Sequence, residues 1–556
     1  MTTEIANAST FKKFPRKVVS SLGWSRTAPL LLITPVELAE SPLIELMESS
    51  LASVSSGKLK TKLAEQLESE FIRLSASHPD IATALIALTS ASLLPQLEGR
   101  LAVANVQAIH TKLIEWSTLE SIDPEMEPLV FLLLRLELPL ILGIVTRDSN
   151  PAELQVLARQ IEVFVEQTLD EEGWVENRIV RDFGSLLMSL ARCIVTLKAM
   201  KIEIGESTVH RVEWMIRNWS RLRQANGALH FSDAIVASTK SVAKLLLRLT
   251  ADKSDRRLLK SFLKSAPDKN VKTPKMLSDP SGYSDSRKFG VFRSNWSTRS
   301  PKLAIAALDT DIILEVSERE MLISGKCLPQ ISRNGKVLRQ EAEQFELICW
   351  NSDNDVDYLE WELPYSDGVR WQRQFAFDKR NGMLFLADNY LGADPARYDY
   401  SCQFPFATGV VAESQADSRE IRLSKGKSLA LVIPLSMGEW KTDRADDTLT
   451  TTETGFEVRQ ARLGRALNVA LAIDLDRRRS SQPVTWRQLT VGEGLKPVPK
   501  DVAVAYRFQI GAKQWVAYRS LGVVGNRTFV GKNVFCDFFF GQFLEDGTVN
   551  TLVAVE

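Results

Sequence analysis

The stretch "SDSRKFGVFRSNWS", residues 284–297, lies where the chain changes its pattern. Before it, Leu-rich segments carry apolar residues at the spacing of amphipathic helices, and after it apolar and polar residues alternate as in strands. We interpret "FGVFRSNWS" as the first strand of a β domain. In that strand Trp296 can anchor the backbone against a core, and Arg293 can pair with a carboxylate at the seam between the halves. The sequence therefore predicts an all-helical half followed by an all-β half.

The helical half is most clearly marked at residues 150–169. Asn150 is suited to cap a helix there, and Pro151 is suited to its first position. The apolar residues that share one face of this helix are Leu154, Leu157, Ile161, Phe164 and Val165. Similar spacing recurs at residues 36–50, 58–75, 81–97, 102–120, 183–200, 208–223 and 233–250. We expect about ten helices and almost no strand before residue 265.

The most apolar run is "PLVFLLLRLELPLILGIV", residues 128–145. Arg135 and Glu137 lie in its middle, where a bilayer would penalise both charges. We therefore expect one buried helix, or two short helices that meet at Pro139. Residues 1–25 contain no apolar segment followed by a cleavage site, so we expect a cytoplasmic protein.

Two joints between helices resemble each other. "DEEGWVENRIVRDFGSLL" begins at Asp170 and "RQANGALHFSDAIV" begins at Arg223. Each follows a helix, and their glycines, Gly173 and Gly227, are 54 residues apart. That distance fits two helices and two loops, so the joints indicate stacked helical hairpins, as in repeat or toroid architectures. Chance similarity between two helix-capping turns is the alternative.

The β half follows a segment rich in Pro, Ser, Asp and Lys, residues 265–286, which we interpret as a linker. In "RWQRQFAF", residues 370–377, apolar and polar side chains alternate. "DKRNGMLFLAD" places Asn381 and Gly382 between two such runs, which is a strong hairpin signal. We expect an antiparallel β-sandwich of about fifteen strands. The predicted domains are thus a helical domain at residues 1–264 and a sandwich at residues 287–556.

Composition limits the function. The 556 residues exceed what one hydrophobic core holds, and 69 basic side chains balance 69 acidic ones. No net field therefore attracts nucleic acid or an anionic membrane, and an anionic ligand needs a local cluster of Arg or Lys. The five scattered cysteines favour free thiols over disulfides or a zinc site. No P-loop, HExxH or nucleophile-elbow pattern occurs, so we expect no cofactor and no metal.

The order of the two halves and the strand that joins them resemble the heparinase II/III-like family of polysaccharide lyases. The residues that carry the resemblance are Gly290, Val291, Phe292, Arg293, Ser294 and Trp296. "GWVENRIVRDFGSLL" from Gly173 and "DVDYLEWELPYSDGVRWQRQFAFDKRNGMLFLADNY" from Asp355 are similar to further parts of the family. The resemblance implies an incomplete α/α toroid followed by an antiparallel β-sandwich. It also implies an acidic polysaccharide or oligosaccharide bound in the cleft between them.

Lyases of this kind cleave a uronic-acid glycoside by β-elimination. The reaction needs a neutralised carboxylate, a base for the C5 proton and an acid for the leaving oxygen. The resemblance implies a His and a Tyr for the two proton transfers, and His230 and Tyr283 are the candidates. His230 follows the turn "QANG" and precedes a helix expected to begin near Ser232. The residues suited to hold the sugar are Trp174, Asn177, Arg178, Arg181 and Asn226. Helix capping, salt bridging and core packing are the structural alternatives for these residues.

The sequence also departs from the family. The family's β domain normally supplies a His, but "LDTDIILEVSEREMLISGKCLPQISRNGK", from Leu308, has none, and no His occurs after residue 230. Tyr398 and Tyr400 are further candidates for acid or base, or core residues of a strand. Glu360 and Glu362 are expected on the polar face of a strand, which permits a hydrolase without arguing for one. Two functions therefore stay open: a polysaccharide lyase, and a noncatalytic glycan-binding or structural protein on the same scaffold.

Overall fold

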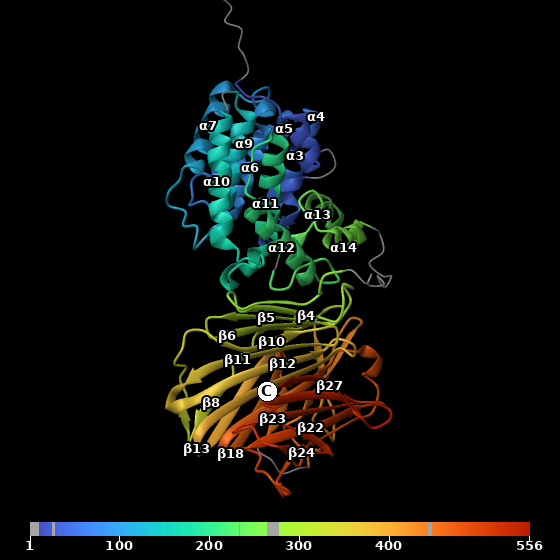
Figure 1. The fold of residues 1–556 in the computed structure, drawn as a ribbon. Coiled ribbons are helices and arrows are strands. Elements are labelled where there is room, and N and C mark those ends of the chain that lie inside the picture. The colour runs from blue at the N-terminus through green and yellow to red at the C-terminus, as the bar shows by residue number, and fades with distance from the viewer. Residues whose placement is uncertain are drawn as a thin grey trace, which may run out of the picture. The chain divides into compact units, whose positions relative to one another are not determined.

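The computed structural model describes residues 10–24, 28–39, 41–147, 150–232, 234–263, 277–442 and 447–556. The chain divides into a helical unit, residues 1–223 and 227–278, and a β unit, residues 224–226 and 279–556. Helices precede strands along the chain, as the sequence predicts (Figure 1). Most of the expected linker, residues 265–276, lies outside the described residues. Its last part contains a strand, β3 (Gly282–Ser284), so the β unit begins before residue 287.

The helical unit follows the predicted apolar spacing closely. Its helices are α1 (Arg16–Leu22), η1 (Pro29–Leu31), α2 (Val36–Ala39), α3 (Pro42–Leu51), α4 (Ser53–Ser56), α5 (Thr61–Leu74), α6 (Ile81–Leu97), α7 (Val103–Ser117), α8 (Pro128–Phe131), η2 (Leu132–Glu137), α9 (Leu138–Val145), α10 (Pro151–Thr168), η3 (Asn177–Asp182), α11 (Phe183–Met200), α12 (Glu206–Leu222), α13 (Thr239–Leu246) and α14 (Lys253–Leu263). Two short strands, β1 (Ile33–Thr34) and β2 (Ile235–Val236), pair antiparallel. At α10 the side chain of Asn150 accepts a hydrogen bond from the backbone of Ala152, as its predicted capping role requires.

The apolar run at residues 128–145 is helical throughout. Its middle, η2, is a π-helix that ends two residues before Pro139, a wider turn that accommodates the missing N–H of the proline. Glu137 is buried there, where Oε1 lies 2.5 Å from Nε of Arg192 and Oε2 accepts from Ser189 at 2.6 Å. The segments Pro128–Val145 and Asn177–Met200 are long and apolar enough to span a bilayer, but 78% of the apolar 18-residue stretch in each is buried within the fold. They are core helices of a soluble protein.

Within the described residues, every pair of neighbouring strands in the β unit is antiparallel. The strands are β3 (Gly282–Ser284), β4 (Phe289–Arg293), β5 (Lys302–Leu308), β6 (Asp311–Ser317), β7 (Met321–Lys326), β8 (Gln330–Arg333), β9 (Lys336–Val337), β10 (Glu346–Ser352), β11 (Val356–Tyr365), β12 (Val369–Asp378), β13 (Met383–Pro405), β14 (Val411–Ser414), β15 (Ile421–Lys425), β16 (Ser428–Pro434), β17 (Thr448–Thr451), β18 (Gly455–Asp474), β19 (Val484–Leu489), β20 (Gly492–Glu493), β21 (Lys496–Pro497), β22 (Ala503–Ile510), β23 (Lys513–Ser520), β24 (Arg527–Phe529), β25 (Lys532–Val534), β26 (Phe538–Phe543) and β27 (Val549–Val555). Asn381 and Gly382 form the predicted hairpin turn between β12 and β13, and Gly382 has a φ of 63°.

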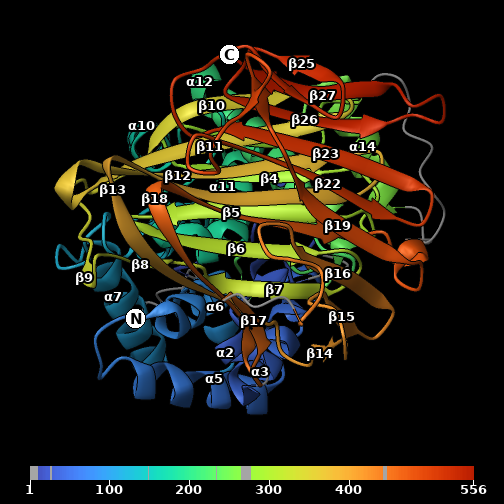
Figure 2. The ribbon, with the colours of Figure 1, turned by 90° about the horizontal axis from the view of Figure 1, so that it is seen from below.

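These strands form four sheets rather than the two of a simple sandwich. A five-stranded sheet (β3–β7) contains "FGVFR" as its second strand, β4, because β3 pairs before it. The central sheet has eleven strands and is spanned by β13 and β18, which pair along most of their length (Figure 2). A second five-stranded sheet (β19, β22, β23, β26, β27) and a four-stranded one (β20, β21, β24, β25) complete the unit.

Separate apolar cores join the sheets in series. The first contains Leu303 and Trp361, from the β3–β7 sheet and the central sheet. The second contains Phe385 and Trp515, from the central sheet and the β19–β27 sheet. A third joins that sheet to the four-stranded one. The central sheet is therefore covered on both faces, which decides the environment of its polar residues.

Candidate functional site

The two similar joints of the helical unit adopt the same turn. Gly173 and Gly227 occupy equivalent places and have φ angles of 70° and 93°, values that favour glycine. The antiparallel bridges that close the turns join Leu169 to Val175 and Arg223 to Leu229, each with the same offset of 54 residues. The shared geometry supports the interpretation of the joints as two copies of one structural element.

The first turn, residues 169–175, is held against α12. A Cβ atom on Gly173 would lie only 2.3 Å from a backbone nitrogen of that helix, so glycine alone fits. Nδ2 of Asn218 donates to the carbonyl oxygen of Glu172 at 2.7 Å, and Nη1 of Arg221 donates to Oδ1 of Asn218 at 2.9 Å. Burial and repulsion from Asp170 raise the pKa of the Glu172 carboxyl, while Arg221 opposes that shift. The end of α12 thus carries a compact polar cluster.

His230 follows the second turn, residues 223–229, and its side chain is buried. Its backbone N–H donates to the carbonyl oxygen of Leu222 at 2.9 Å, and its ring meets Phe231 edge-on with centroids 6.5 Å apart. Phe231 has a φ of 60°, a left-handed conformation that residues with a Cβ atom seldom adopt. Backbone strain of this kind concentrates at functional sites, so the segment 230–232 is a candidate.

Ser232 ties this segment to the first joint. Its hydroxyl donates to the carbonyl oxygen of Arg181, in η3, at 2.8 Å. The prediction that a helix begins near Ser232 is wrong, because residues 235–236 form β2 and α13 begins only after Ser238. Ser238 is the cap, since its hydroxyl accepts from the backbone N–H of Ser241 at 3.3 Å. His230 and Arg181 consequently lie in segments that contact each other.

The residues predicted to hold a sugar differ in accessibility. Trp174 is buried and packs against Phe183, with ring centroids 6.3 Å apart, so its ring offers no free face for stacking in this conformation. Asn177, at the start of η3, is half-buried. Arg178, Arg181 and Asn226 are exposed. Accessibility therefore favours the two arginines and Asn226 as ligand-binding side chains.

Arg178 and Arg181 also differ in their partners. Nε of Arg178 lies 2.6 Å from Oε2 of Glu176, in an exposed ion pair. Arg181 forms no ion pair within the described part of the chain. A guanidinium group in water can bind a carboxylate or sulfate bidentately. Arg181 can do this without giving up an ion pair, whereas Arg178 would have to release Glu176.

Tyr283 lies in β3 of the β unit and is part of its first core. Its hydroxyl donates to Oδ1 of Asp285 at 3.1 Å and accepts from Nε1 of Trp361 at 2.8 Å. Its ring packs against Trp350, with centroids 5.2 Å apart. Burial raises the pKa of the Tyr283 hydroxyl, so the group keeps its proton at neutral pH. A protonated phenol can donate a proton but is not prepared to accept one.

The joining stretch "FRSNWS" has a structural role inside the β unit. Arg293 is buried, donates from Nη2 to the carbonyl oxygen of Ser297 at 2.9 Å, and lies over the ring of Trp296 at 5.4 Å. The ring and the carbonyl fix the guanidinium group in place. Trp296 is buried, as the anchoring role predicts.

The candidate tyrosines of the central sheet, Tyr398 and Tyr400, are buried, and so is Glu360. Tyr400 donates to Oδ2 of Asp388 at 2.6 Å, and Tyr398 donates to the carbonyl oxygen of Arg465 at 3.3 Å. Both rings belong to the first core, which is the structural alternative stated for them. Glu360, expected on the polar face of its strand, has polar partners but no access to solvent, because it is buried in an ion pair with Arg519 at 2.7 Å.

Histidines and metal ligands are sparse in the described residues. His110 is half-buried on α7 against Phe11, and burial lowers its pKa. Nε2 of His210, on α12, accepts from Nε1 of Trp214 at 3.0 Å. Within the described ranges, no three His, Cys, Asp or Glu side chains are grouped so that they could hold a metal ion. The five cysteines are free thiols, and Cys349 alone among them is not fully buried.

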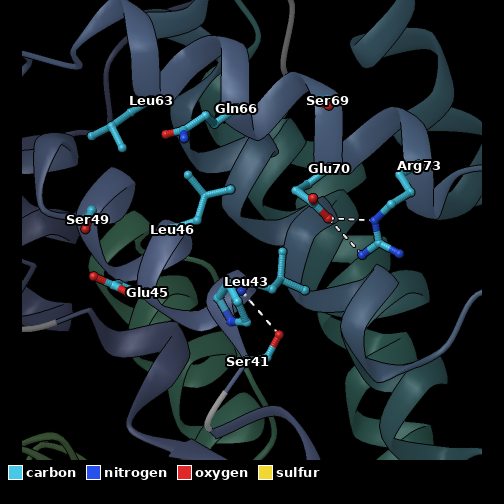
Figure 3. Close-up of a pocket in the computed structure, with 11 residues that line it drawn as sticks. Ser41, Leu43, Glu45, Leu46, Ser49, Leu63, Gln66, Ser69, Glu70 and Arg73 are labelled. Atoms are coloured by element: carbon cyan, nitrogen blue, oxygen red, sulfur yellow. Dashed lines mark hydrogen bonds and ion pairs between the residues drawn. The ribbon is translucent and has the colours of Figure 1, made fainter.

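Three surface cavities lie within the individual units. Figure 3 shows one between α3 and α5, where Glu70 and Arg73 form an ion pair on the wall and the Ser41 side chain caps α3. A second lies on α1, α4 and α13, and a third lies beside β8 in the β unit. Of the residues named as candidates to act on a sugar, Tyr400 alone lines one of these three cavities, the one beside β8.

Comparison with known proteins identifies the fold. No protein-family model matches the sequence, and no curated protein matches it. The structure is similar to the heparan sulfate lyase HepC from Pedobacter heparinus, with a TM-score of 0.55 and 12% identity over 86% of this chain and 81% of that one. It is also similar to a heparinase III, with a TM-score of 0.58 and 8% identity over 85% of this chain and 82% of that one. The chain therefore has the polysaccharide lyase fold that the resemblance predicts.

Proposed function

We propose that this protein binds a uronic-acid-containing polysaccharide or oligosaccharide and cleaves it by β-elimination. The observation that carries the proposal is the fold, which is shared with a heparan sulfate lyase over 86% of the chain. Because fold alone does not fix chemistry, the proposal also assigns roles to residues. The proposed ligand is acidic glycan, with neither nucleic acid nor membrane as a partner. The proposed location is the cytoplasm, where imported oligosaccharides would be the substrate.

His230 is the proposed base. An imidazole accepts protons near neutral pH, and the strained residue beside His230 supports a functional role for this segment. In the proposed reaction the base removes the C5 proton of the uronate, the bond from C4 to the leaving oxygen breaks, and a double bond forms between C4 and C5. A phenol then protonates the leaving oxygen, and Tyr283, with its raised pKa, is the proposed donor.

The proposed sugar contacts are Arg178, Arg181 and Asn226, which are exposed. An arginine paired with the uronate carboxylate would lower the cost of removing the adjacent C5 proton. Trp174 and Asn177 are proposed to position these side chains rather than to meet the sugar first, because Trp174 is buried and Asn177 is half-buried.

A specific observation favours a second candidate, a noncatalytic glycan-binding protein. The hydroxyl of Tyr283 is engaged by Asp285 and Trp361 inside the core, and the chain has no His after residue 230. A scaffold with this arrangement could hold an acidic glycan through its arginines without eliminating it.

One assay separates the two candidates. The protein is incubated with heparan sulfate, chondroitin sulfate, alginate, ulvan and glucuronan, and the ultraviolet absorbance of the unsaturated uronate is followed. We expect a product with at least one substrate, which His230→Ala abolishes and the matched control His210→Ala preserves. Binding without product, measured by calorimetry on the same panel and lost in Arg178→Ala/Arg181→Ala, would establish the noncatalytic candidate. If no member of the panel gives a product and none is bound, the proposal is overturned.

A further inference from the structure

A basic cavity lies within the helical unit, and none of its lining residues is assigned to the sugar. It has a volume of about 700 Å³ and is formed by the segment before α1, by α1, by the end of α4 and by α13. Four cationic side chains line it: Lys13, Arg16, Lys244 and Arg248. We call it the basic cavity. The hydroxyl groups on its wall belong to Ser20, Ser21, Ser55 and Ser241.

The cations of the basic cavity have no acidic counterpart. No Asp or Glu is among the described residues that line it. Within the same described ranges, none of the four cations forms an ion pair, although the chain as a whole has as many acidic as basic side chains. Ion pairs do form elsewhere in the unit, for example between Arg217 and Asp255 at 2.9 Å. The basic cavity therefore has a local excess of positive charge, although the chain as a whole has no net charge.

Two helices present these cations to the same space. Lys244 and Arg248 are four residues apart on and just after α13, so their side chains share one face. Arg16 and Ser20 have the same spacing on α1. Nη2 of Arg248 donates to the carbonyl oxygen of Ser20 at 3.0 Å, which ties the two elements together. Like charges at this spacing repel each other, and that repulsion is relieved when an anion binds between them.

Lys13, in the segment before α1, is the fourth cation of the basic cavity. Its Nζ atom would lie 3.2 Å from a Cβ atom on Gly57, at the C-terminal end of α4. Helix C-termini account for Lys244, in the last turn of α13, and for Arg248, which bonds to a carbonyl in the last turn of α1. They do not account for Arg16, which is the first residue of α1. The convergence of all four on one hollow is the observation that points to a ligand.

We propose that the basic cavity binds an anionic ligand that carries sulfate or phosphate groups. Guanidinium groups, ammonium groups and serine hydroxyls together supply the donors that a tetrahedral oxyanion accepts. The volume lies in the range of small-ligand sites, about 300 to 1,000 Å³. The shared chemistry is the oxyanion, and its two sources are a sulfated saccharide and a phosphorylated metabolite. His230 is not among the residues that line the basic cavity, and the proposal does not depend on β-elimination.

The test uses the full-length protein and three probes: inorganic phosphate, inositol hexakisphosphate and a heparin-derived tetrasaccharide. Dissociation constants are measured by calorimetry at low and at physiological salt. Lys244→Gln/Arg248→Gln is compared with Lys60→Gln/Lys62→Gln, which removes two exposed positive charges of the same unit outside the basic cavity. We expect the first pair to weaken binding by about tenfold and the second by less than about twofold. Circular dichroism confirms that both variants are folded.

The outcomes are distinct. Tight binding of the tetrasaccharide alone identifies a sulfated glycan, and tight binding of inositol hexakisphosphate alone identifies a phosphorylated ligand; both support the site. Equal weakening by the two double variants would mean that only net charge matters and would overturn the proposal, as would the absence of binding by any probe. Because Arg178→Ala/Arg181→Ala leaves the basic cavity intact, its effect on the uronate panel reports on the proposed function separately.

Discussion

At the scale of single residues, Gly173 shows how one missing side chain fixes a turn. Its φ of 70° favours glycine, and a Cβ atom there would approach the backbone of α12 to 2.3 Å. We predict that Gly173→Ala lowers the free energy of unfolding by about 3 kcal/mol or more, because strain and clash add. Gly227→Ala is the matched control, since a Cβ atom there would meet only the Thr239 hydroxyl at 3.4 Å. It should cost about 1 to 2 kcal/mol, and equal losses in urea unfolding would contradict the role given to the close approach.

Asp357 predicts a pH dependence of stability. This carboxyl is buried in the β unit, and burial raises its pKa from 3.8 to about 6 although Lys379 lies 2.7 Å away. Between these two values the unfolded chain has lost the proton and the folded chain still holds it, so raising the pH favours unfolding. The stability that Asp357 contributes by holding its proton is therefore fully present below 3.8, the pKa of this carboxyl in the unfolded chain. It is lost as the pH rises through about 6, the pKa in the folded chain.

The measurement is urea unfolding of the wild type and of Asp357→Asn from about pH 4 to about pH 7. We expect the stability of the wild type relative to the variant to fall by up to about 3 kcal/mol across that interval. Asp546→Asn is the control: hydrogen bonds from Thr548 lower the pKa of Asp546 from 3.8, so its contribution to stability changes below the measured interval and stays nearly constant within it. A constant difference between wild type and Asp357→Asn would show that the buried carboxyl keeps its ordinary pKa.

At the scale of elements, the sequence predicts correctly those helices and turns that are determined by residues close together in the chain. Asn150 and the apolar face of α10 specified that helix, and Asn381–Gly382 specified the β12–β13 hairpin. The start of α13 was wrongly predicted, because Ser232 and Ser238 are both acceptable caps in sequence and the choice is made when Ser232 bonds to Arg181, 51 residues away. A sequence pattern contains no information about that distant carbonyl.

The same limit explains the polar residues of the central sheet. Alternation in β11 predicts one apolar and one polar face, but Glu360 is buried because Arg519, 159 residues later, covers it. The candidate site shares this limit: the similarity of the two joints predicted their common turn, whereas the burial of Tyr283 depends on Trp361, 78 residues away. Neighbours that are distant in sequence decide which candidates meet solvent.

The pairing of two sheets through Glu360 and Arg519 gives a testable coupling between elements. Glu360, on β11, also accepts from Tyr358 at 2.6 Å, and Arg519, on β23, also donates to Gln372 at 2.6 Å. We predict that Arg519→Met lowers the free energy of unfolding by about 3 to 5 kcal/mol, because it leaves a buried carboxylate without its cation. Glu360→Gln/Arg519→Met should recover much of that loss. Additive effects in the double-mutant cycle would contradict a direct coupling between the sheets.

At the scale of the whole molecule, the boundary of the β unit can be tested directly. The linker composition predicts a β domain that begins at residue 287, but β3 and Ser281 lie before that point and belong to the fold. Ser281 donates to Oδ2 of Asp357 at 2.6 Å, and Tyr283 accepts from Trp361 at 2.8 Å. The β unit also has its own cores between its sheets, so we expect the fragment 277–556 to fold alone.

The two fragments 277–556 and 287–556 separate the contribution of β3 from that of the remaining sheets. The shorter one loses the edge strand, the Tyr283 ring and the hydrogen bond to Asp357, so β4 becomes an exposed edge. We predict that it is less stable by about 3 to 5 kcal/mol, from one buried aromatic side chain and two buried hydrogen bonds. Urea unfolding followed by tryptophan fluorescence measures the difference, because Trp350 and Trp361 contact Tyr283. Equal midpoints would place the boundary at residue 287 and reduce β3 to a peripheral strand, whereas failure of both fragments to fold would show that the β unit needs the helical unit.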